Sequence, residues 1–179
     1  MNAANRFEAI STLTVPVVTY SFNIVNWKIS EIKRLDRKTR KLLTIRRMHH
    51  PKADVNRMYL PRRIGGRGLT KLETAYKSTT TEMETYLRNT DDALLQLVLQ
   101  HETKKKLYSI QKEAAKFRRE FEVPNLDRAA NERVTKFARR VKQRVKQQAQ
   151  DIEVKQWEER ERRILYTRKI PQKKKGSRC

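Results

Sequence analysis

The sequence predicts an all-α protein, a helical bundle followed by a long basic helix and a disordered tail. Apolar residues recur at intervals of three and four through much of the chain, which places them on one face of a helix. Only four Gly and five Pro interrupt the 179 residues, so few positions break a helix. With 37% hydrophobic and 35% charged residues, the chain can bury a modest core and must leave much of its surface solvated.

The net charge restricts the class of partner. The 43 Lys and Arg residues against 20 Asp and Glu give +23, and a compact chain with this charge repels itself unless a polyanion neutralises it. Nucleic acid is the first candidate and an anionic membrane surface the second, while a basic protein without such a partner is the plain alternative. No run approaches the roughly 20 apolar residues of a membrane helix, so we expect no membrane partner.

Cysteine usage and the first residues bear on location. Cys179 is the only cysteine, which excludes disulfides within the chain and cysteine-based zinc sites. Residues 1–10 lack the basic-then-apolar order of a signal peptide. We therefore expect an intracellular, reducing location, with the nucleus as one candidate, and no metal or other cofactor.

Residues 2–25 are predicted to form a first helix, with Pro16 as a kink or early stop. Its expected apolar face consists of Phe7, Ile10, Leu13 and Val17. The most hydrophobic patch of the chain follows and consists of Tyr20, Phe22, Ile24, Val25 and Trp27.

The next predicted helix has Ser30 as its N-cap and Glu31 in its first turn. Its apolar arc consists of Ile32, Leu35, Thr39, Leu42 and Leu43. The opposite arc is basic, and two further cations follow it: Lys33, Arg34, Arg37, Lys38, Arg40, Lys41, Arg46 and Arg47. Asp36 is the one acid among them. A helix that is merely solvated mixes charges of both signs, so this face favours contacts to nucleic-acid phosphates.

A glycine loop follows Pro51 and a short turn that Asp54 is expected to cap. The loop residues expected to bind are Arg62, Arg63, Gly65, Gly66 and Arg67. Glycine lets the backbone approach a ligand, so free N–H groups and guanidiniums could hold a phosphate. No Gly-Lys-Ser/Thr follows, so this is not a P-loop, and a plain tight turn is the alternative.

The remaining elements are predicted from caps and breaks. Thr70 and Glu73 form the pattern of a capping box for a helix reaching Leu87, and Asp91 is expected to cap the next helix. Capping also explains the Asp91-Asp92 pair, which does not lie at a β-hairpin tip as polymerase chemistry requires. A long helix is expected from about Leu126 to about Leu165, suited to lying on nucleic acid or to pairing in a coiled coil.

Adjacent His49 and His50 precede Pro51 and lack the spacing and nearby partners of a metal site. We expect them to have a structural or phosphate-contacting role.

The run from Leu35 to Leu69, LDRKTRKLLTIRRMHHPKADVNRMYLPRRIGGRGL, resembles a segment of a known enzyme family. It resembles the region just after the polymerase core in reverse transcriptases of non-LTR (LINE-like) retrotransposons with a restriction-like endonuclease. That family has Leu-Asp-x-Lys-Thr-Arg-Lys-Leu-Leu-Thr, then His-Pro, Leu-Tyr and Arg-x-x-Gly-Gly-Arg-Gly-Leu. Met58-Tyr59 stands here where Leu-Tyr is usual. The resemblance covers nearly all of residues 2–170 and is weakest past residue 104.

The resemblance implies a thumb and the linker that follows it. It implies a thumb-like helical domain at 1–103, a basic helical linker at 104–168 and a disordered basic tail at 169–179. The implied partners are a template–primer duplex, either RNA–DNA or DNA, bound without sequence preference, and the palm and fingers of the parent polymerase. Tyr20, Phe22 and Trp27 would pack against that palm or against the thumb's own helices.

The sequence lacks the paired aspartates of a polymerase palm, so we expect a fragment without enzymatic activity. Because the resemblance begins near residue 2, it implies that Met1 is an internal or artificial start. The alternative is a helical interaction protein that dimerises as a coiled coil through residues 126–152.

Overall fold

The computed structural model describes residues 3–104, 109–124 and 126–169, and for residues 3–4, 103 and 162–169 it describes the backbone alone. The described part of the chain contains helices and no β-strand, which confirms the predicted all-α class. The α-helices are α1 (Ala3–Ala9), α2 (Val15–Tyr20), α3 (Ile29–Ile45), α4 (Asn56–Tyr59), α5 (Leu72–Asn89), α6 (Ala93–Lys104), α7 (Ile110–Glu120) and α8 (Val134–Lys169).

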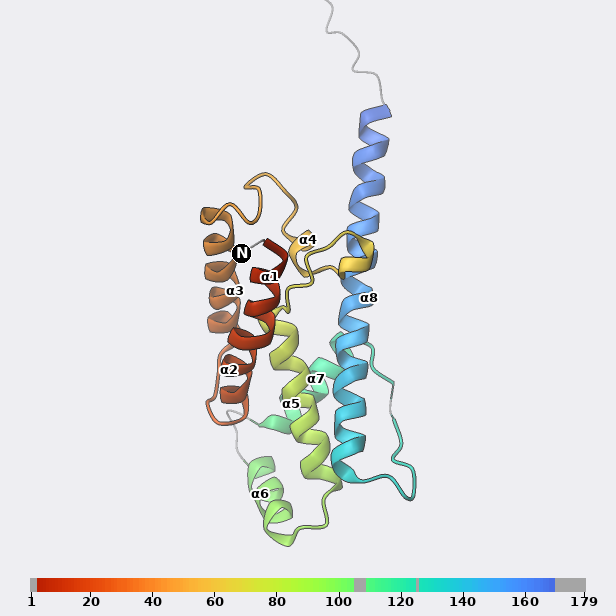
Figure 1. Cartoon of the computed structure of the whole chain (residues 1–179). Helices are drawn as coiled ribbons and strands as arrows, with labels where there is room; N and C mark the ends of the chain where they lie inside the picture. The colour runs from red at the N-terminus through yellow and green to blue at the C-terminus, as the bar shows by residue number, and fades with distance from the viewer. Residues whose placement is uncertain (1–2, 105–108, 125, 170–179) are drawn as a thin grey trace, which may run out of the picture.

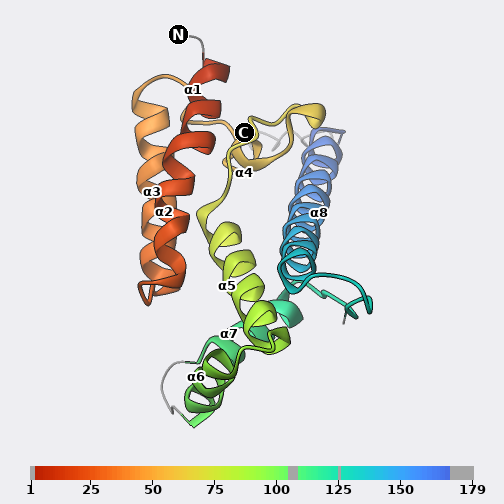
Figure 2. The ribbon, with the colours of Figure 1, turned by 60° about the horizontal axis from the view of Figure 1, so that its bottom comes forward.

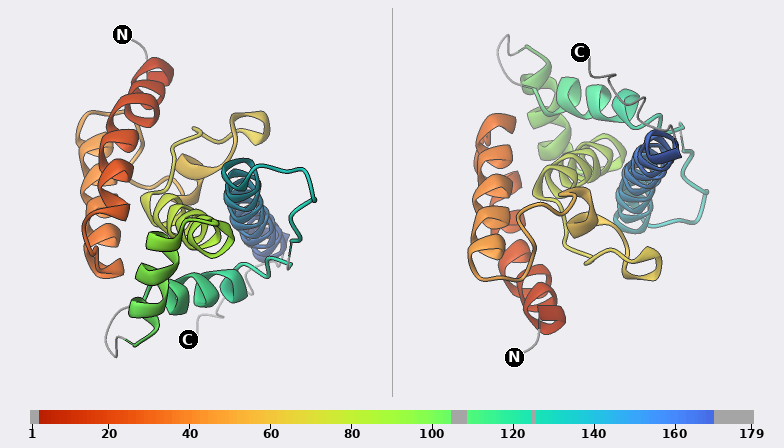
Figure 3. Two further views of the ribbon diagram at one scale, coloured as in Figure 1. Left: turned by 90° about the horizontal axis from the view of Figure 1, so that it is seen from below. Right: turned by 90° about the horizontal axis from the view of Figure 1, so that it is seen from above.

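Helix α5 lies at the centre of the arrangement (Figure 1). Helices α1 to α3 lie on one side of α5 and α8 lies on the other, which Figure 2 also shows. Seen along α5, α7 packs on a third side and the chain around α4 arches over the end nearest the start of α5 (Figure 3).

A π-helical turn, η1 (Ile10–Thr14), joins α1 to α2 and rotates the apolar face of the first helical run. The N–H of Val15 donates to the carbonyl of Ile10, five residues back, so the turn takes up one residue more than an α-helical turn. Pro16 follows in the first turn of α2, where its missing N–H is tolerated. The predicted kink is therefore a widened turn, and the helical run continues past the proline.

The extra residue makes the predicted apolar face of residues 2–25 only half correct. Phe7 is buried as expected, but Leu13 and Val17 are 68% and 73% exposed. Beyond η1, the buried residues are Val15 and Phe22 in place of Leu13 and Val17. The prediction assumed a regular period of 3.6 residues across the π-turn, so it placed the apolar face of the following residues wrongly.

Aromatic side chains fasten the first helices to α5. Phe22, in the 3₁₀ turn η2 (Ser21–Asn23), packs edge-on against Tyr76 of α5, with ring centroids 5.3 Å apart. Tyr76 in turn packs against Phe117 of α7 at 6.1 Å. Trp27 packs against Phe22 at 6.4 Å. Of the residues expected to pack here, Tyr20 does not, since it is 78% exposed.

The central helix α5 buries mostly polar side chains. Its buried residues are Leu72, Ala75, Tyr76, Lys77, Ser78, Thr79, Thr80, Thr81, Glu84, Thr85 and Leu87. Several hydroxyls donate to carbonyls of the same helix, as Thr81 does to Lys77 at 2.8 Å and Thr85 does to Thr81 at 2.7 Å. Because these bonds are internal to α5, the hydroxyls are satisfied without water.

The start of α5 is capped by a carboxylate from another helix. Asp36 of α3 is buried, and its two oxygens accept the backbone N–H groups of Leu72 and Glu73 at 3.2 and 3.3 Å. The predicted capping box of Thr70 and Glu73 is therefore wrong, because no side-chain cap from Lys71, the N-cap residue, or from Thr70 is formed. The Glu73 side chain instead pairs with Lys77 at 2.8 Å.

Three other predicted helix starts are also corrected. Helix α3 begins two residues early, so Ser30 lies inside it, and the carboxylate of Glu31 accepts the N–H of Lys28. The carboxylate of Asp92, and not of Asp91, accepts the N–H groups that open α6. Helix α8 begins at Val134 and not near Leu126, because residues 126–133 form a turn-containing connection.

The end of the chain agrees with the prediction in part. The backbone of α8 is helical through Lys169. The predicted disordered tail, apart from Lys169, lies outside the described residues.

We predict that the Asp36 cap stabilises the fold. Asp36→Ala removes both acceptors from two N–H groups at a buried helix start, which should lower the free energy of unfolding by about 2 kcal/mol. Asp36→Asn keeps one acceptor oxygen and should lose less. Urea unfolding followed by circular dichroism measures both, and equal stability of Asp36→Ala and the wild type would contradict the cap.

The same cap should respond to pH. Burial raises the pKa of Asp36 above 3.8, and the N–H groups of Leu72 and Glu73 with the charges of Arg40 and Lys71 only partly oppose it. An acid whose pKa is raised in the folded state costs stability when ionised, and this cost is relieved as the pH falls toward the unfolded pKa. The stability of the wild type relative to Asp36→Asn should therefore rise between about pH 7 and about pH 4. A difference that stays constant would contradict the assignment.

Candidate nucleic-acid interface

Helix α3 places its cations on the side opposite its buried face. Ile32, Asp36 and Leu43 are buried toward the rest of the molecule, whereas the predicted apolar residue Leu42 is 60% exposed. Four exposed cations have no hydrogen bond or ion pair with any described residue, and we call them the α3 cationic face: Arg34, Arg37, Lys38 and Lys41. They span about 10 Å along the helix at 1.5 Å per residue.

The other predicted cations of α3 already have partners. Lys33 is 3.5 Å from the carboxylate of Glu73 and remains half exposed. Arg40 is partly buried and donates to the hydroxyl of Tyr59 in α4 at 2.9 Å. Burial and the charge of Asp36 raise the pKa of Tyr59 to about 12 against the opposing effect of Arg40, so this phenol stays protonated and keeps α4 joined to α3. Arg40 therefore positions α4.

Arg46 and Arg47 extend the cationic surface beyond the end of α3. Both side chains are exposed. Arg47 has a left-handed backbone, with φ of 56°, and the N–H of the next residue, Met48, returns to the carbonyl of Leu43 at 2.9 Å. This geometry is the ordinary left-handed stop of a helix, usually made by glycine. It turns the two arginines away from the helix axis.

Most backbone N–H groups of the glycine loop, residues 61–69, donate to carbonyls of the chain. The N–H groups of Gly65 and Gly66 donate to the carbonyls of Arg62 and Pro61, and that of Gly68 donates to Leu60 at 2.9 Å. The N–H groups of Arg67 and Leu69 also bond within the loop region. Because these N–H groups have partners within the chain, an anion here would meet mainly side chains, and phosphate binding by the loop stays a prediction.

The two predicted binding glycines have conformational roles. Gly65 has a φ of 81°, a conformation that disfavours side chains. A Cβ on Gly66 would lie 2.0 Å from the carbonyl oxygen of Leu60, so no side chain fits there. Among the loop arginines, Arg62 lies 3.5 Å from Glu8, while Arg63 and Arg67 are exposed.

The predicted residues fall in two regions. The loop projects toward α8, where Pro61 and Gly68 share a hollow with Lys146 and Gln150. Figures 1 and 3 show the short helix of the loop, η3 (Arg62–Ile64), beside α8 and far from α3. The α3 cationic face and the loop arginines therefore do not form one patch.

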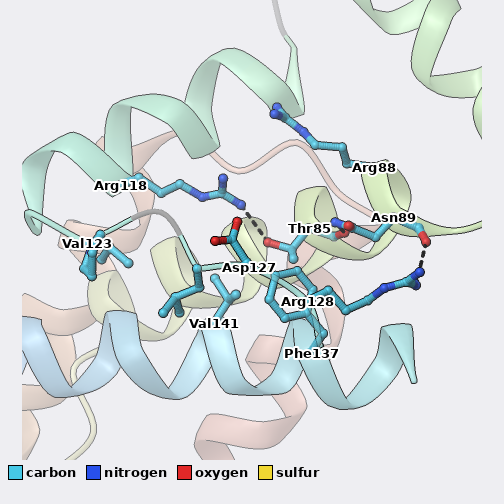
Figure 4. A pocket seen from close by; sticks show the side chains of 11 residues that line it. Thr85, Arg88, Asn89, Arg118, Val123, Asp127, Arg128, Phe137 and Val141 are labelled. Carbon is cyan, nitrogen blue, oxygen red and sulfur yellow. Dashed lines mark hydrogen bonds between the residues drawn. The ribbon is translucent and has the colours of Figure 1, made fainter. Parts of the chain in front are cut away.

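A hollow of about 350 Å³ between α5, α7 and α8 also contains arginines, but carboxylates and backbone oxygens engage them. Arg118 donates to Glu84 at 2.6 Å and to Thr85 at 2.7 Å, and Arg88 pairs with the same buried Glu84. Arg128 donates to the carbonyl of Asn89 at 3.3 Å (Figure 4). These contacts hold α7 and the connection before α8 to α5, so we assign this cluster a structural role.

The histidines and acids noted in the sequence do not gather into a site. His49 is buried with Nε2 3.3 Å from the carbonyl of Ala53, and His50 accepts the N–H of Lys52. No three His, Cys, Asp or Glu side chains of the described residues lie together as a metal site would need. In the same part of the chain, no helix combines the length and apolarity needed to cross a bilayer.

Asp36 is the residue that the sequence reasoning overlooked. It was counted only as the one acid among eight cations. A lone acid on the apolar side of a basic helix is the signal that could have identified it, because a buried carboxylate requires donors.

We predict that Gly66 tolerates no side chain. Gly66→Ala would place a methyl group against the Leu60 backbone and should lower the free energy of unfolding by about 3 kcal/mol. Gly65→Ala meets no atom and should cost only the left-handed backbone, about 1 kcal/mol. Urea denaturation compares the two, and equal losses would contradict the tight turn around Leu60.

Comparison of the chain with protein families, with curated proteins and with solved structures gives no match. A function must therefore be inferred from the chain's own residues and their geometry.

Proposed function

We propose that this chain binds a nucleic-acid duplex through Lys and Arg contacts to phosphates, without reading sequence. It would do so as the thumb and following linker of a non-LTR retrotransposon reverse transcriptase, with no catalytic residues of its own. The α3 cationic face carries the proposal, because four exposed cations without described partners lie on one helical face. Exposed arginine and lysine side chains at this spacing suit successive phosphates and carry no base preference.

The position of Asp36 strengthens the case for binding. It is the only acid between Lys33 and Arg47, and it is buried as the cap of α5. The exposed side of α3 therefore carries only cations, without a negative charge among them from Asp36. Duplex DNA presents about one negative charge per 1.7 Å of its axis, so several phosphates can lie opposite this face.

The coiled-coil alternative requires the apolar stripe of α8 to be free. The stripe is instead buried within the chain at Phe137, Val141 and Val145, and α8 packs along α5. A dimer through residues 126–152 would have to displace this packing. The observations therefore favour the duplex-binding proposal.

The proposal also gives a partner to an exposed apolar stripe. Leu13, Val17, Tyr20 and Ile24 lie on the outer side of the first helical run and are all at least 68% exposed. Contiguous exposed apolar residues mark interaction surfaces. In a reverse transcriptase, the palm and fingers that precede the thumb would cover this stripe.

The first test of this proposal removes the α3 cationic face. If about six phosphates are neutralised, the logarithm of the binding constant should fall against the logarithm of salt concentration with a slope near −5. Replacing Arg34, Arg37, Lys38 and Lys41 by Ala should weaken binding to unrelated duplexes equally and bring the slope to about −2. Fluorescence anisotropy titrations at several salt concentrations measure both.

A charge-matched control separates this face from the general positive charge. Replacing Lys104, Lys112, Lys116 and Arg119 by Ala removes the same charge from exposed positions of α6 and α7. This control set should keep nearly the wild-type affinity. Equal losses in the two variants, or an altered sequence preference in the first, would contradict phosphate binding by α3.

The proposed origin has a separate test in the genomic DNA upstream of the Met1 codon. That DNA should contain an intact or decayed frame that encodes the aromatic-x-Asp-Asp of a polymerase palm. An unrelated upstream sequence would contradict the reverse-transcriptase origin without bearing on duplex binding.

A further inference from the structure

Helix α8 carries a second group of exposed cations. Between Arg133 and Gln147 its surface contains seven basic residues and no acid. Arg140 and Lys142 are engaged by Glu132 and Glu82 at 2.7 and 2.6 Å. The other four helical cations are exposed and form no hydrogen bond or ion pair with any described residue, and we call them the α8 cationic face: Lys136, Arg139, Arg144 and Lys146.

The surroundings of Lys146 indicate an excess of positive charge. Burial and the neighbouring Lys142 lower the pKa of Lys146, and Glu82 only partly opposes them. Gln143 and Gln147 lie among the same cations and supply amide N–H donors. Glu132 and Glu82 each pair with one cation of this segment, and the four cations of the α8 cationic face remain for the phosphates of a nucleic acid.

The two cationic faces belong to helices on opposite sides of α5. Helix α3 buries Ile32 and Asp36 toward α5, whereas α8 buries Val141 and Val145, and Val145 packs with Phe121 in a separate cluster. In every view α3 and α8 lie on opposite sides of α5 (Figures 1 and 3).

With about 10 Å between packed helix axes, the axes of α3 and α8 lie roughly 20 Å apart. The α3 cationic face points away from α5. The α8 cationic face extends from the outer side of α8 to its edges, where Arg139 borders a hollow with Glu82 of α5 and Lys146 borders the hollow beside the glycine loop.

One duplex cannot reach both faces. Bending a site of 20 to 30 base pairs by even 40° to 90° costs on the order of 1–6 kcal/mol. To pass from the outer side of α3 to the outer side of α8, a duplex would have to turn back on itself around a body only a few helices wide. The stiffness of nucleic acid therefore assigns the two faces to different segments.

We infer that a single molecule of this protein bridges two nucleic-acid segments, one on the α3 cationic face and a second on the α8 cationic face. The inference rests on the proposed function of α3 and adds a second site on α8. The short helix of the glycine loop lies beside α8 in Figure 1, and the loop residues Arg63 and Arg67 are exposed.

The test uses the full chain and two short duplexes, one with a donor dye and one with an acceptor dye. With duplex in excess, calorimetry should give two duplexes per wild-type chain, and mixing the labelled duplexes should give energy transfer. Replacing Lys136, Arg139, Arg144 and Lys146 by Ala should reduce the ratio to one and abolish the transfer. The α6–α7 control set should keep both, and circular dichroism should show unchanged helicity in each variant.

A charge-conserving variant guards against effects on folding. Exchanging Lys for Arg and Arg for Lys at the same four positions should preserve bridging, because phosphates are recognised by charge. Light scattering of the free protein should show a monomer. This control is needed because a dimer could bridge two duplexes through its two α3 cationic faces, even without the α8 cationic face.

The outcomes separate the two proposals. A wild type that saturates at one duplex, or an α8 variant that bridges like the wild type, would overturn the inference, and duplex binding by α3 would stand. Unchanged binding and bridging after loss of the α3 cationic face would instead remove the proposed function.

Discussion

Helix α5 is enclosed by α3, α7 and α8, although much of the surface that it buries is polar. A polar group removed from water costs free energy unless it forms a hydrogen bond or an ion pair. The other helices can therefore pack on α5 only if its buried polar groups find such partners. The solution differs along the helix. Asp36 accepts the N–H groups at its start, threonine hydroxyls bond within it, and Lys77 lies between Glu73 at 2.8 Å and Glu120 at 2.5 Å. Near its end Glu84 holds Arg118 of α7. Asp36 comes from α3, and both Glu120 and Arg118 come from α7, so the polar groups of α5 also determine where these two helices lie.

This arrangement separates the charges of the chain by sign. Acids are scarce, and several of them are used at helix–helix junctions: Asp36, Glu73 and Glu84 are all partly or fully buried. With these acids buried, the outer sides of α3 and of the first half of α8 carry cations in excess of acids. Both flanking helices, α3 and α8, have a buried side against α5 and a cationic outer side. The same requirement that stabilises the core thus leaves two opposed surfaces that are suited to polyanions.

Local regularities of the sequence were the most reliable guides. The all-α class, the helices α3, α5 and α6, and the exposure of Arg34, Arg37 and Lys38 followed from periodicity and charge. The errors lie where one residue changes the register or where a partner is distant. The π-turn at Ile10–Thr14 displaced the apolar face, and Asp92 replaced Asp91 as a cap. The helix boundary near Leu126 was missed because residues 126–133 carry helix-compatible composition but form a turn.

The sequence by itself determined the helical period, the sign of the surface charge and the glycines required by a tight loop, because each depends on neighbours within a few residues. Only the tertiary structure decided which charges are free. Arg37 and Arg40 both belong to the basic side of α3 by their spacing in the sequence. Arg40 nevertheless donates to Tyr59, 19 residues away, whereas Arg37 contacts no described partner. Asp36 likewise caps a helix that begins 36 residues later. Such pairings depend on how helices pack, and short-range periodicity carries no information about contacts made across that distance.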